Sequence, residues 1–138
     1  MKQTTIEQEL REKGQGLFQT KGVSMEPLLH HHYSTVLIQT FEGAPRLNDV
    51  LLYKRSNGTY VLHRVINVSR DSCITLGDNS PAKESVPFSA ILGRMTGFFN
   101  GDDFTDCETD ESYKRYLKKL PILRIKVFLR SLRNRFVR

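Results

Sequence analysis

Tryptophan is absent from the sequence, and cysteine occurs only at Cys73 and Cys107. Two cysteines are too few for a disulfide framework, so a hydrophobic core must hold the chain together. The 138 residues suit one domain with one modest core, to which Phe and Tyr contribute the large side chains. Cys73 lies in an apolar run and is expected to be a buried thiol, whereas Cys107 lies in an acidic segment.

Long apolar runs are also missing. The N-terminal segment MKQTTIEQELREKGQG has no apolar stretch of the kind found in signal peptides. No segment reaches the roughly 18 uncharged apolar residues of a membrane-spanning helix. We therefore expect a cytoplasmic protein, either free or attached peripherally to the inner face of the membrane.

Acidic residues are absent from one part of the chain. Residues 113–138 contain ten Lys and Arg and no Asp or Glu. The whole chain has 21 basic and 15 acidic residues, so residues 1–112 hold 11 against 15, a net charge of −4. The basic character therefore belongs to the C-terminal segment alone.

Patterns typical of β-strands fill the centre of the sequence. β-branched and apolar residues, separated by Gly, Asn and Ser, predict strands at 34–41, 48–55, 59–68, 72–77 and 86–99. Because no helical pattern separates them, they favour an antiparallel barrel or sandwich.

Helices are expected only at the two ends. Residues 4–13 fit a short helix with a capping box at Thr4 and Glu7 and a C-terminal stop at Gly14. An acidic linker, 101–112, then precedes a basic amphipathic helix in 113–138, with Pro121 in the first turn of its periodic part.

Ser24, in the stretch GVSMEP, is the candidate nucleophile. A serine becomes nucleophilic when a base lies within hydrogen-bond reach and donors stabilise the oxyanion. His63 is the histidine inside a predicted strand, and alternation places it on the face of Val61 and Val65. Taken singly, His63 is more typical of a hydrogen-bonded core histidine, and Ser24 is more typical of an ordinary buried hydroxyl.

Five short motifs in order carry more weight than either residue, namely GVSMEPLL, NDVLLY, YVLHRVI, LGDN and ILGRM. In this order they resemble the boxes of the signal peptidase I and SOS-repressor superfamily of serine peptidases. The resemblance covers about residues 15–95. Bacterial signal peptidases have Lys before Arg-Val in the third box, whereas the endoplasmic-reticulum type has His, as this chain does.

The resemblance implies a fold and a set of site residues. The fold would be mainly β, a coiled antiparallel barrel-like peptidase core in residues 1–100. Ser24 would be the nucleophile and His63 the general base, because an imidazole with a pKa near 6.5 can accept a proton at pH 7. Asp78 would orient His63, with Glu84 as the fallback, although Asp78 in GDNS is equally typical of a turn.

Residues beside the nucleophile are assigned to substrate and oxyanion binding. Met25 would pack next to the substrate-binding face, and Pro27 would fix the chain that leaves the nucleophile turn. Gly22 stands where many signal peptidases have a serine that helps the oxyanion, so backbone N–H groups, that of Ser24 first, would form the oxyanion hole. The chain also departs from the family's membrane enzymes, because no spanning helix precedes Ser24.

Two further groups of residues have side chains that can bind metal or act as a base. The run of His30, His31 and His32 is expected to be a solvated loop, with metal binding as the alternative, since three successive histidines cannot all face one metal. Lys54 is an alternative base, but its place beside a turn favours a solvated lysine. No metal or cofactor is expected.

The C-terminal segment allows three interpretations. Ile122, Ile125 and Leu129, continued by Leu132 and Phe136, form an apolar stripe at helical spacing. This stripe would lie on an anionic membrane surface, or dock on a partner or on the chain's own domain. Nucleic acid ranks last, because the rest of the chain is acidic and has no recognition motif.

The expected function is a serine endopeptidase that cleaves a leader or signal-type segment of a peptide or protein precursor, bound in extended form. The alternative is a catalytically silent module of the same fold that binds or regulates a partner.

Overall fold

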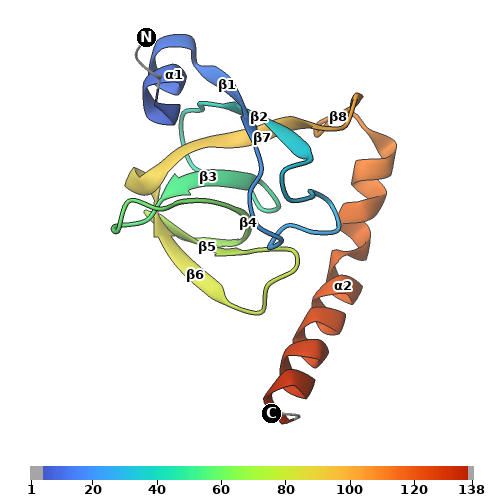
Figure 1. Ribbon diagram of the computed structural model, residues 1–138. Coiled ribbons are helices and arrows are strands. Elements are labelled where there is room, and N and C mark those ends of the chain that lie inside the picture. Colours follow the sequence, from blue (N-terminus) through green and yellow to red (C-terminus); the bar gives the residue numbers. More distant parts are fainter. Residues whose placement is uncertain (1–4, 137–138) are drawn as a thin grey trace.

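The computed structural model describes residues 5–136 and is mainly β (Figure 1). Helix α1 spans Ile6–Lys13 and helix α2 spans Glu111–Phe136. Between them lie eight strands, β1 (Gln15–Gln19), β2 (Ser34–Gln39), β3 (Val50–Lys54), β4 (Tyr60–Val68), β5 (Ser72–Leu76), β6 (Lys83–Pro87), β7 (Ile91–Asn100) and β8 (Asp103–Asp106), with a 3₁₀ turn at Phe88–Ala90.

The strands form one antiparallel sheet in the order β1-β2-β7-β3-β4-β5-β6, and β8 pairs with β7. The sheet is curved but open, since β1 and β6 do not pair within residues 5–136. The prediction of a mainly β, antiparallel fold is confirmed, but the sheet is not closed into a barrel. Side chains of the loop after β1 and of α2, including Met25, Leu28 and Tyr113, complete the core in place of strand pairing.

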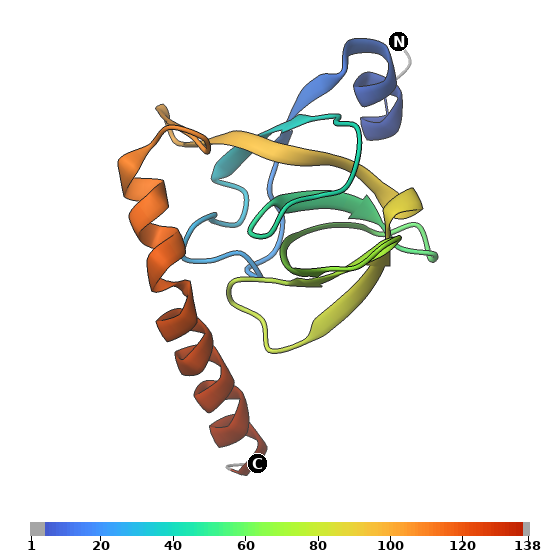
Figure 2. The same cartoon turned by 180° about the vertical axis from the view of Figure 1, so that it is seen from behind.

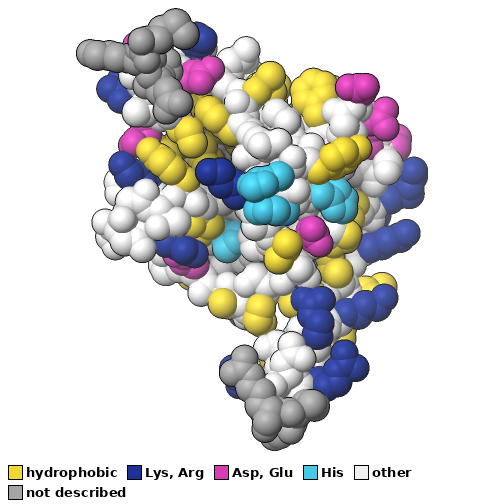
Figure 3. Space-filling model, viewed as in Figure 1, with side chains coloured by type: hydrophobic (Ala, Val, Ile, Leu, Met, Phe, Trp, Pro, Cys, Tyr) yellow, Lys and Arg dark blue, Asp and Glu magenta, His cyan; other side chains and the backbone are white. Residues whose placement is uncertain are grey.

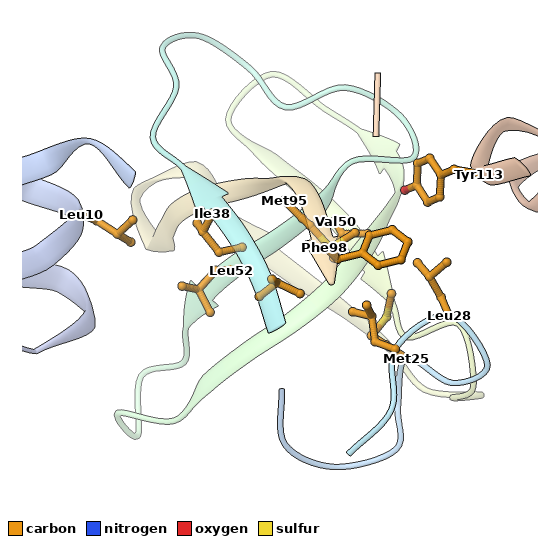
Figure 4. Packing of buried hydrophobic residues seen from close by; sticks show 11 residues of the cluster. Leu10, Met25, Leu28, Ile38, Val50, Leu52, Met95, Phe98 and Tyr113 are labelled. Atoms are coloured by element: carbon orange, nitrogen blue, oxygen red, sulfur yellow. The ribbon is translucent and has the colours of Figure 1, made fainter. Parts of the chain in front are cut away.

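Strand β3 lies between β7 and β4 and is buried on both faces. Val50 and Leu52 point into a larger core with Ile38, Met95 and Phe98, seen in Figure 4. Leu51 and Tyr53 point the other way, into a smaller core with Val61, Val65 and Cys73. The alternation of β3 thus separates two environments, and the candidate site lies at the junction with β4.

Helix α1 begins at Ile6, two residues later than predicted, with Thr5 as its N-cap. The Thr5 hydroxyl accepts a hydrogen bond from the Gln8 N–H, and Gly14 ends the helix in the left-handed conformation at φ 72°. Thr4 lies outside the described residues. Glu7 accepts hydrogen bonds from Lys54 Nζ and the Tyr60 hydroxyl instead of closing a capping box.

Helix α2 lies along one side of the sheet, and its C-terminal end extends past β6 in both views (Figures 1 and 2). Tyr113, Leu120 and Val127, spaced by seven residues, are buried. Pro121 is inside the helix rather than at its start. The prediction that Pro121 lies in a first helical turn is wrong. The helix already begins at Glu111, and buried residues on both sides of Pro121 hold it as one continuous helix.

Strands β1, β6 and β8 were not expected. β6 contains Lys83, Glu84 and Pro87, and β8 lies within the segment read as an acidic linker. Polar and Pro-containing strands are typical of sheet edges, where alternation is weak. Among the described residues, no helix is both long and apolar enough to cross a lipid bilayer.

Candidate functional site

Ser24 lies in a turn that is anchored on both sides. Its neighbour Met25 is buried in the larger core, whereas Val23 is 55% exposed. Asn79 holds the turn, because its backbone N–H donates to the Ser24 carbonyl at 2.8 Å and its side-chain amide donates to the Val23 carbonyl at 3.1 Å. Met25 and the hydrogen bonds from Asn79 therefore fix the turn, and Ser24 is half-buried.

His63 extends from β4 toward this turn. Its Nε2 atom lies 3.1 Å from Ser24 Oγ, within hydrogen-bond distance. The His63 side chain shares its face of β4 with Val61 and Val65, as alternation predicted. The structure thus brings together the two residues that the sequence paired, across 39 positions of chain.

Behind His63, the Tyr53 hydroxyl is surrounded by three polar groups. It donates to Glu84 Oε1 at 2.5 Å, lies 3.0 Å from Thr75 Oγ1, and is 3.5 Å from His63 Nδ1, the long end of hydrogen-bond range. These groups come from β3, β4, β5 and β6, four neighbouring strands. Sequence reasoning missed Tyr53 and Thr75, and placed Glu84 directly on the histidine.

The hydrogen-bond partners of the Tyr53 hydroxyl favour one tautomer of His63. A tyrosine hydroxyl has one proton, and Glu84 can only accept it while ionised. Hydrogen bonds from Arg55 hold the pKa of Glu84 below its ordinary value, so the carboxylate is charged at neutral pH. The Tyr53 oxygen can then only accept from His63, which places the proton on Nδ1 and leaves the Nε2 lone pair facing Ser24.

Burial sets the charge of the imidazole. Desolvation lowers the pKa of His63 below 6.5, against the weaker opposite effect of the Glu84 charge. The neutral ring therefore dominates at pH 7. In this state Nε2 can take the Ser24 proton, which is the requirement for a general base.

Asp78 does not orient His63, and this part of the sequence prediction is wrong. Its buried carboxylate accepts two hydrogen bonds from Arg64, at 2.8 and 2.9 Å, and one from the Tyr116 hydroxyl at 2.7 Å. The reason is the alternation of β4, which turns Arg64 and its partner to the face opposite His63. Arg64 also donates to the Tyr113 hydroxyl, so the ion pair joins β4 to α2.

Gly77 is required by close packing. A Cβ at this position would lie 2.6 Å from the Ser24 carbonyl oxygen and 3.1 Å from His63 Nε2. Only glycine lets the Gly77–Asn79 turn approach the Ser24–His63 pair this closely.

A groove of about 560 Å³ runs up to Ser24 and His63. Its walls come from residues 18–22, which connect β1 to the nucleophile turn, and from residues 59–63 at the start of β4. The deepest lining residues are apolar and buried: Met25, Leu29, Val36, Ile38 and Leu52. Figure 3 shows this face of the molecule, with histidine side chains near its centre.

One donor is available beside the hydroxyl. Within residues 5–136, the backbone N–H of Ser24 donates to no protein acceptor, so it can meet an oxyanion. The Gly22 N–H instead donates to His31 Nδ1 at 2.5 Å, and Gly22 has φ 80°. Pro27 is exposed in the turn after Met25.

The remaining candidates lie apart from the dyad. His30, His31 and His32 are exposed, and no cluster of three metal-binding side chains is found in the described part of the chain. Lys54 pairs with Glu7 at 3.1 Å, which raises its pKa, so it is not the base that was considered as an alternative. Cys73 is buried, as predicted, and both cysteines are free thiols.

Comparison of the sequence with protein family models, of the sequence with curated proteins, and of the fold with solved structures finds no match.

Proposed function

We propose that this protein is a serine endopeptidase of the signal peptidase type, with Ser24 as nucleophile and His63 as general base. The observation that carries the proposal is the 3.1 Å distance between Ser24 Oγ and His63 Nε2. A buried, neutral imidazole whose other nitrogen is held by Tyr53 is in the state that a general base needs.

The proposed reaction follows from this geometry. Ser24 Oγ attacks the scissile carbonyl carbon while His63 Nε2 takes the hydroxyl proton, and the carbonyl electron pair moves to an oxyanion at the Ser24 N–H. His63 then gives the proton to the leaving amine as the C–N bond breaks. A water molecule, deprotonated by the same nitrogen, hydrolyses the acyl-enzyme and restores Ser24.

The groove supports a particular substrate class. An extended peptide would lie between residues 18–22 and 59–63, where β1 is the edge strand of the sheet and can pair with it. The buried apolar residues beneath would accept apolar side chains next to the cleaved bond. A leader or signal-type segment of a precursor protein, which is extended and apolar near its cleavage site, fits these requirements.

The experiment is cleavage of a peptide mixture derived from a digested proteome, with the new N-termini identified by mass spectrometry. We expect cuts after short apolar segments with wild-type protein, and none with Ser24→Ala or His63→Ala at unchanged melting temperature. Equal retention of extended apolar peptides by wild type and Ser24→Ala, without any cleavage, would instead support the catalytically silent binding module.

A further inference from the structure

Helix α2 has two apolar faces, and only one of them is used by the fold. Tyr113, Leu120 and Val127 are buried. Ile122 and Leu129 lie on the opposite side of the helix, two residues further along each time, which is a rotation of about 200°. The inner face accounts for the packing of α2 on the rest of the molecule, whereas the exposure of the outer face needs another explanation.

We call the outer face the α2 stripe and define it as Ile122, Ile125, Phe128 and Leu129. These four side chains are 59%, 59%, 57% and 56% exposed. The expectation that this stripe docks on the chain's own domain is therefore wrong, because a docked Leu129 would be buried. Four large apolar side chains on one exposed surface form a patch of the kind that marks a binding site.

A row of positive charge runs beside the stripe. Lys119, Lys126 and Arg133, spaced by seven residues, are exposed and follow one edge of it. Dark blue side chains of α2 are visible along the right-hand edge of the molecule in Figure 3. The segment 113–138 contains no acidic residue that could neutralise them.

Other basic residues of α2 are already used inside the molecule. Arg130 donates to Asn79 Oδ1 at 2.7 Å, and Arg124 is half-buried with Nη2 3.9 Å from Asp78 Oδ1. Arg124 and Arg130 thus connect α2 to the Gly77–Asn79 turn, which contacts the turn that carries Ser24. The outward-facing Lys119, Lys126 and Arg133 have no such internal role.

We propose that the α2 stripe and its basic row bind an anionic phospholipid surface, with α2 lying flat on it. An apolar stripe bordered by Lys and Arg is the pattern of an interfacial helix, whose apolar side chains enter the bilayer while its cations contact head groups. Charge complementarity favours this occupant, because residues 1–112 have a net charge of −4 and would be repelled by the same surface. The attraction to the lipid surface is therefore confined to α2, and the sheet would face away from the lipid. This inference does not depend on the catalytic role of Ser24.

The test is co-sedimentation of the full chain with vesicles of phosphatidylglycerol and phosphatidylcholine, compared with phosphatidylcholine alone. Deletion of α2 is unsuitable, because it would remove Tyr113, Leu120 and Val127 from the core. Point substitutions at exposed positions avoid this problem. We expect wild-type protein to bind the anionic vesicles, and high salt to weaken the binding.

Removing charge from the row should weaken binding most. Each basic residue near an anionic surface strengthens binding about fivefold, so the triple variant Lys119→Gln, Lys126→Gln, Arg133→Gln should bind roughly 100-fold more weakly. The matched control removes three charges from exposed positions elsewhere: Arg11→Gln, Arg70→Gln and Lys83→Gln. The control should bind about as well as wild type, because these positions lie outside α2.

The stripe is tested by Leu129→Glu, with Leu47→Glu as the control, because Leu47 is 63% exposed but lies outside α2. We expect at least about tenfold weaker binding for Leu129→Glu, no loss for Leu47→Glu, and unchanged melting temperatures for both.

Three outcomes would overturn the proposal: no difference between the two vesicle types, equal losses in variant and control, or wild-type dimers in solution that Leu129→Glu dissociates without any vesicle binding. The last outcome would assign the stripe to a second copy of the chain. None of them would affect the peptidase proposal, which is tested on short peptides.

Discussion

His63 and Arg64 are neighbours on β4, yet their environments differ completely. His63 faces a groove, with a single 3.1 Å contact to Ser24 and a long 3.5 Å contact to Tyr53. Arg64 faces α2, where its guanidinium is fully buried and makes two short hydrogen bonds to Asp78. The imidazole of His63 thus has few contacts and borders a groove, whereas the guanidinium of Arg64 is enclosed and hydrogen-bonded at each of its nitrogens.

The comparison separates a candidate reaction site from a structural one. A base must lose and regain a proton, so it needs a neutral state and room for a substrate. A buried ion pair instead holds its proton. Burial alone would lower the pKa of Arg64, but the hydrogen bonds and charge of Asp78 outweigh it and raise this pKa. Asp78 therefore belongs to the stability of the fold, although its motif suggested catalysis.

The largest expected effect lies on the His63 side. Ser24→Ala and His63→Ala should each reduce the rate of peptide cleavage by at least about 10⁴-fold, and the double variant by no more, because nucleophile and base act as a unit. Single-turnover kinetics on a peptide identified in the library experiment measures this. Additive losses would indicate that the two residues act independently.

The next effect lies on the Arg64 side and concerns stability. Asp78→Asn leaves Arg64 buried without its counter-charge and should lower the free energy of unfolding by about 3–5 kcal/mol, measured by chemical denaturation. Glu84→Gln, at a partly exposed ion pair, is the control and should cost less than about 1 kcal/mol. An Asp78→Asn variant of full stability but no activity would return Asp78 to the catalytic machinery.

A smaller effect should come from the contact between Tyr53 and His63. Tyr53→Phe removes the acceptor that holds the proton on Nδ1, so the cleavage rate should fall roughly 10- to 100-fold with little change in KM. Tyr33→Phe, at a residue 58% exposed, is the matched control and should retain full activity. Equal rates for Tyr53→Phe and wild type would show that the tautomer does not depend on this hydroxyl.

The smallest effect is on the pH profile. Because burial lowers the pKa of His63, the cleavage rate should rise with pH through a midpoint below 6.5 and be level at neutral pH. The rate rises with pH because His63 acts as a base only when neutral, and the activity is lost as the imidazole is protonated at lower pH. Glu84→Gln removes a charge that raises this pKa, and should move the midpoint slightly further down. A rise confined to alkaline pH would instead indicate a lysine.

Much of this arrangement could be read from the sequence, for identifiable reasons. The order of motifs paired Ser24 with His63, and strand alternation gave the correct face of β4. Tyr53 could also have been found, since the turn at SNG sets a hairpin register in which Leu51 lies opposite His63 and Tyr53 follows on the same face. Asp78 could not be placed, because Tyr116, which donates to it, comes from a helix that local patterns do not dock, as does Tyr113, which accepts from its partner Arg64.

The pairing of two dissimilar neighbours on β4 has a consequence for how the chain folds. A slip of β4 by one residue would exchange the faces of all its side chains, turning Arg64 into the groove and His63 toward α2. In such a register Asp78 would lose its ion pair with Arg64, and the imidazole of His63 would be buried beside Tyr113 and Tyr116. The cost of that unpaired carboxylate, about 3–5 kcal/mol, disfavours the misaligned hairpin. Arg64 takes no part in the proposed chemistry, but we expect its ion pair with Asp78 to select the register of β4 in which His63 faces Ser24.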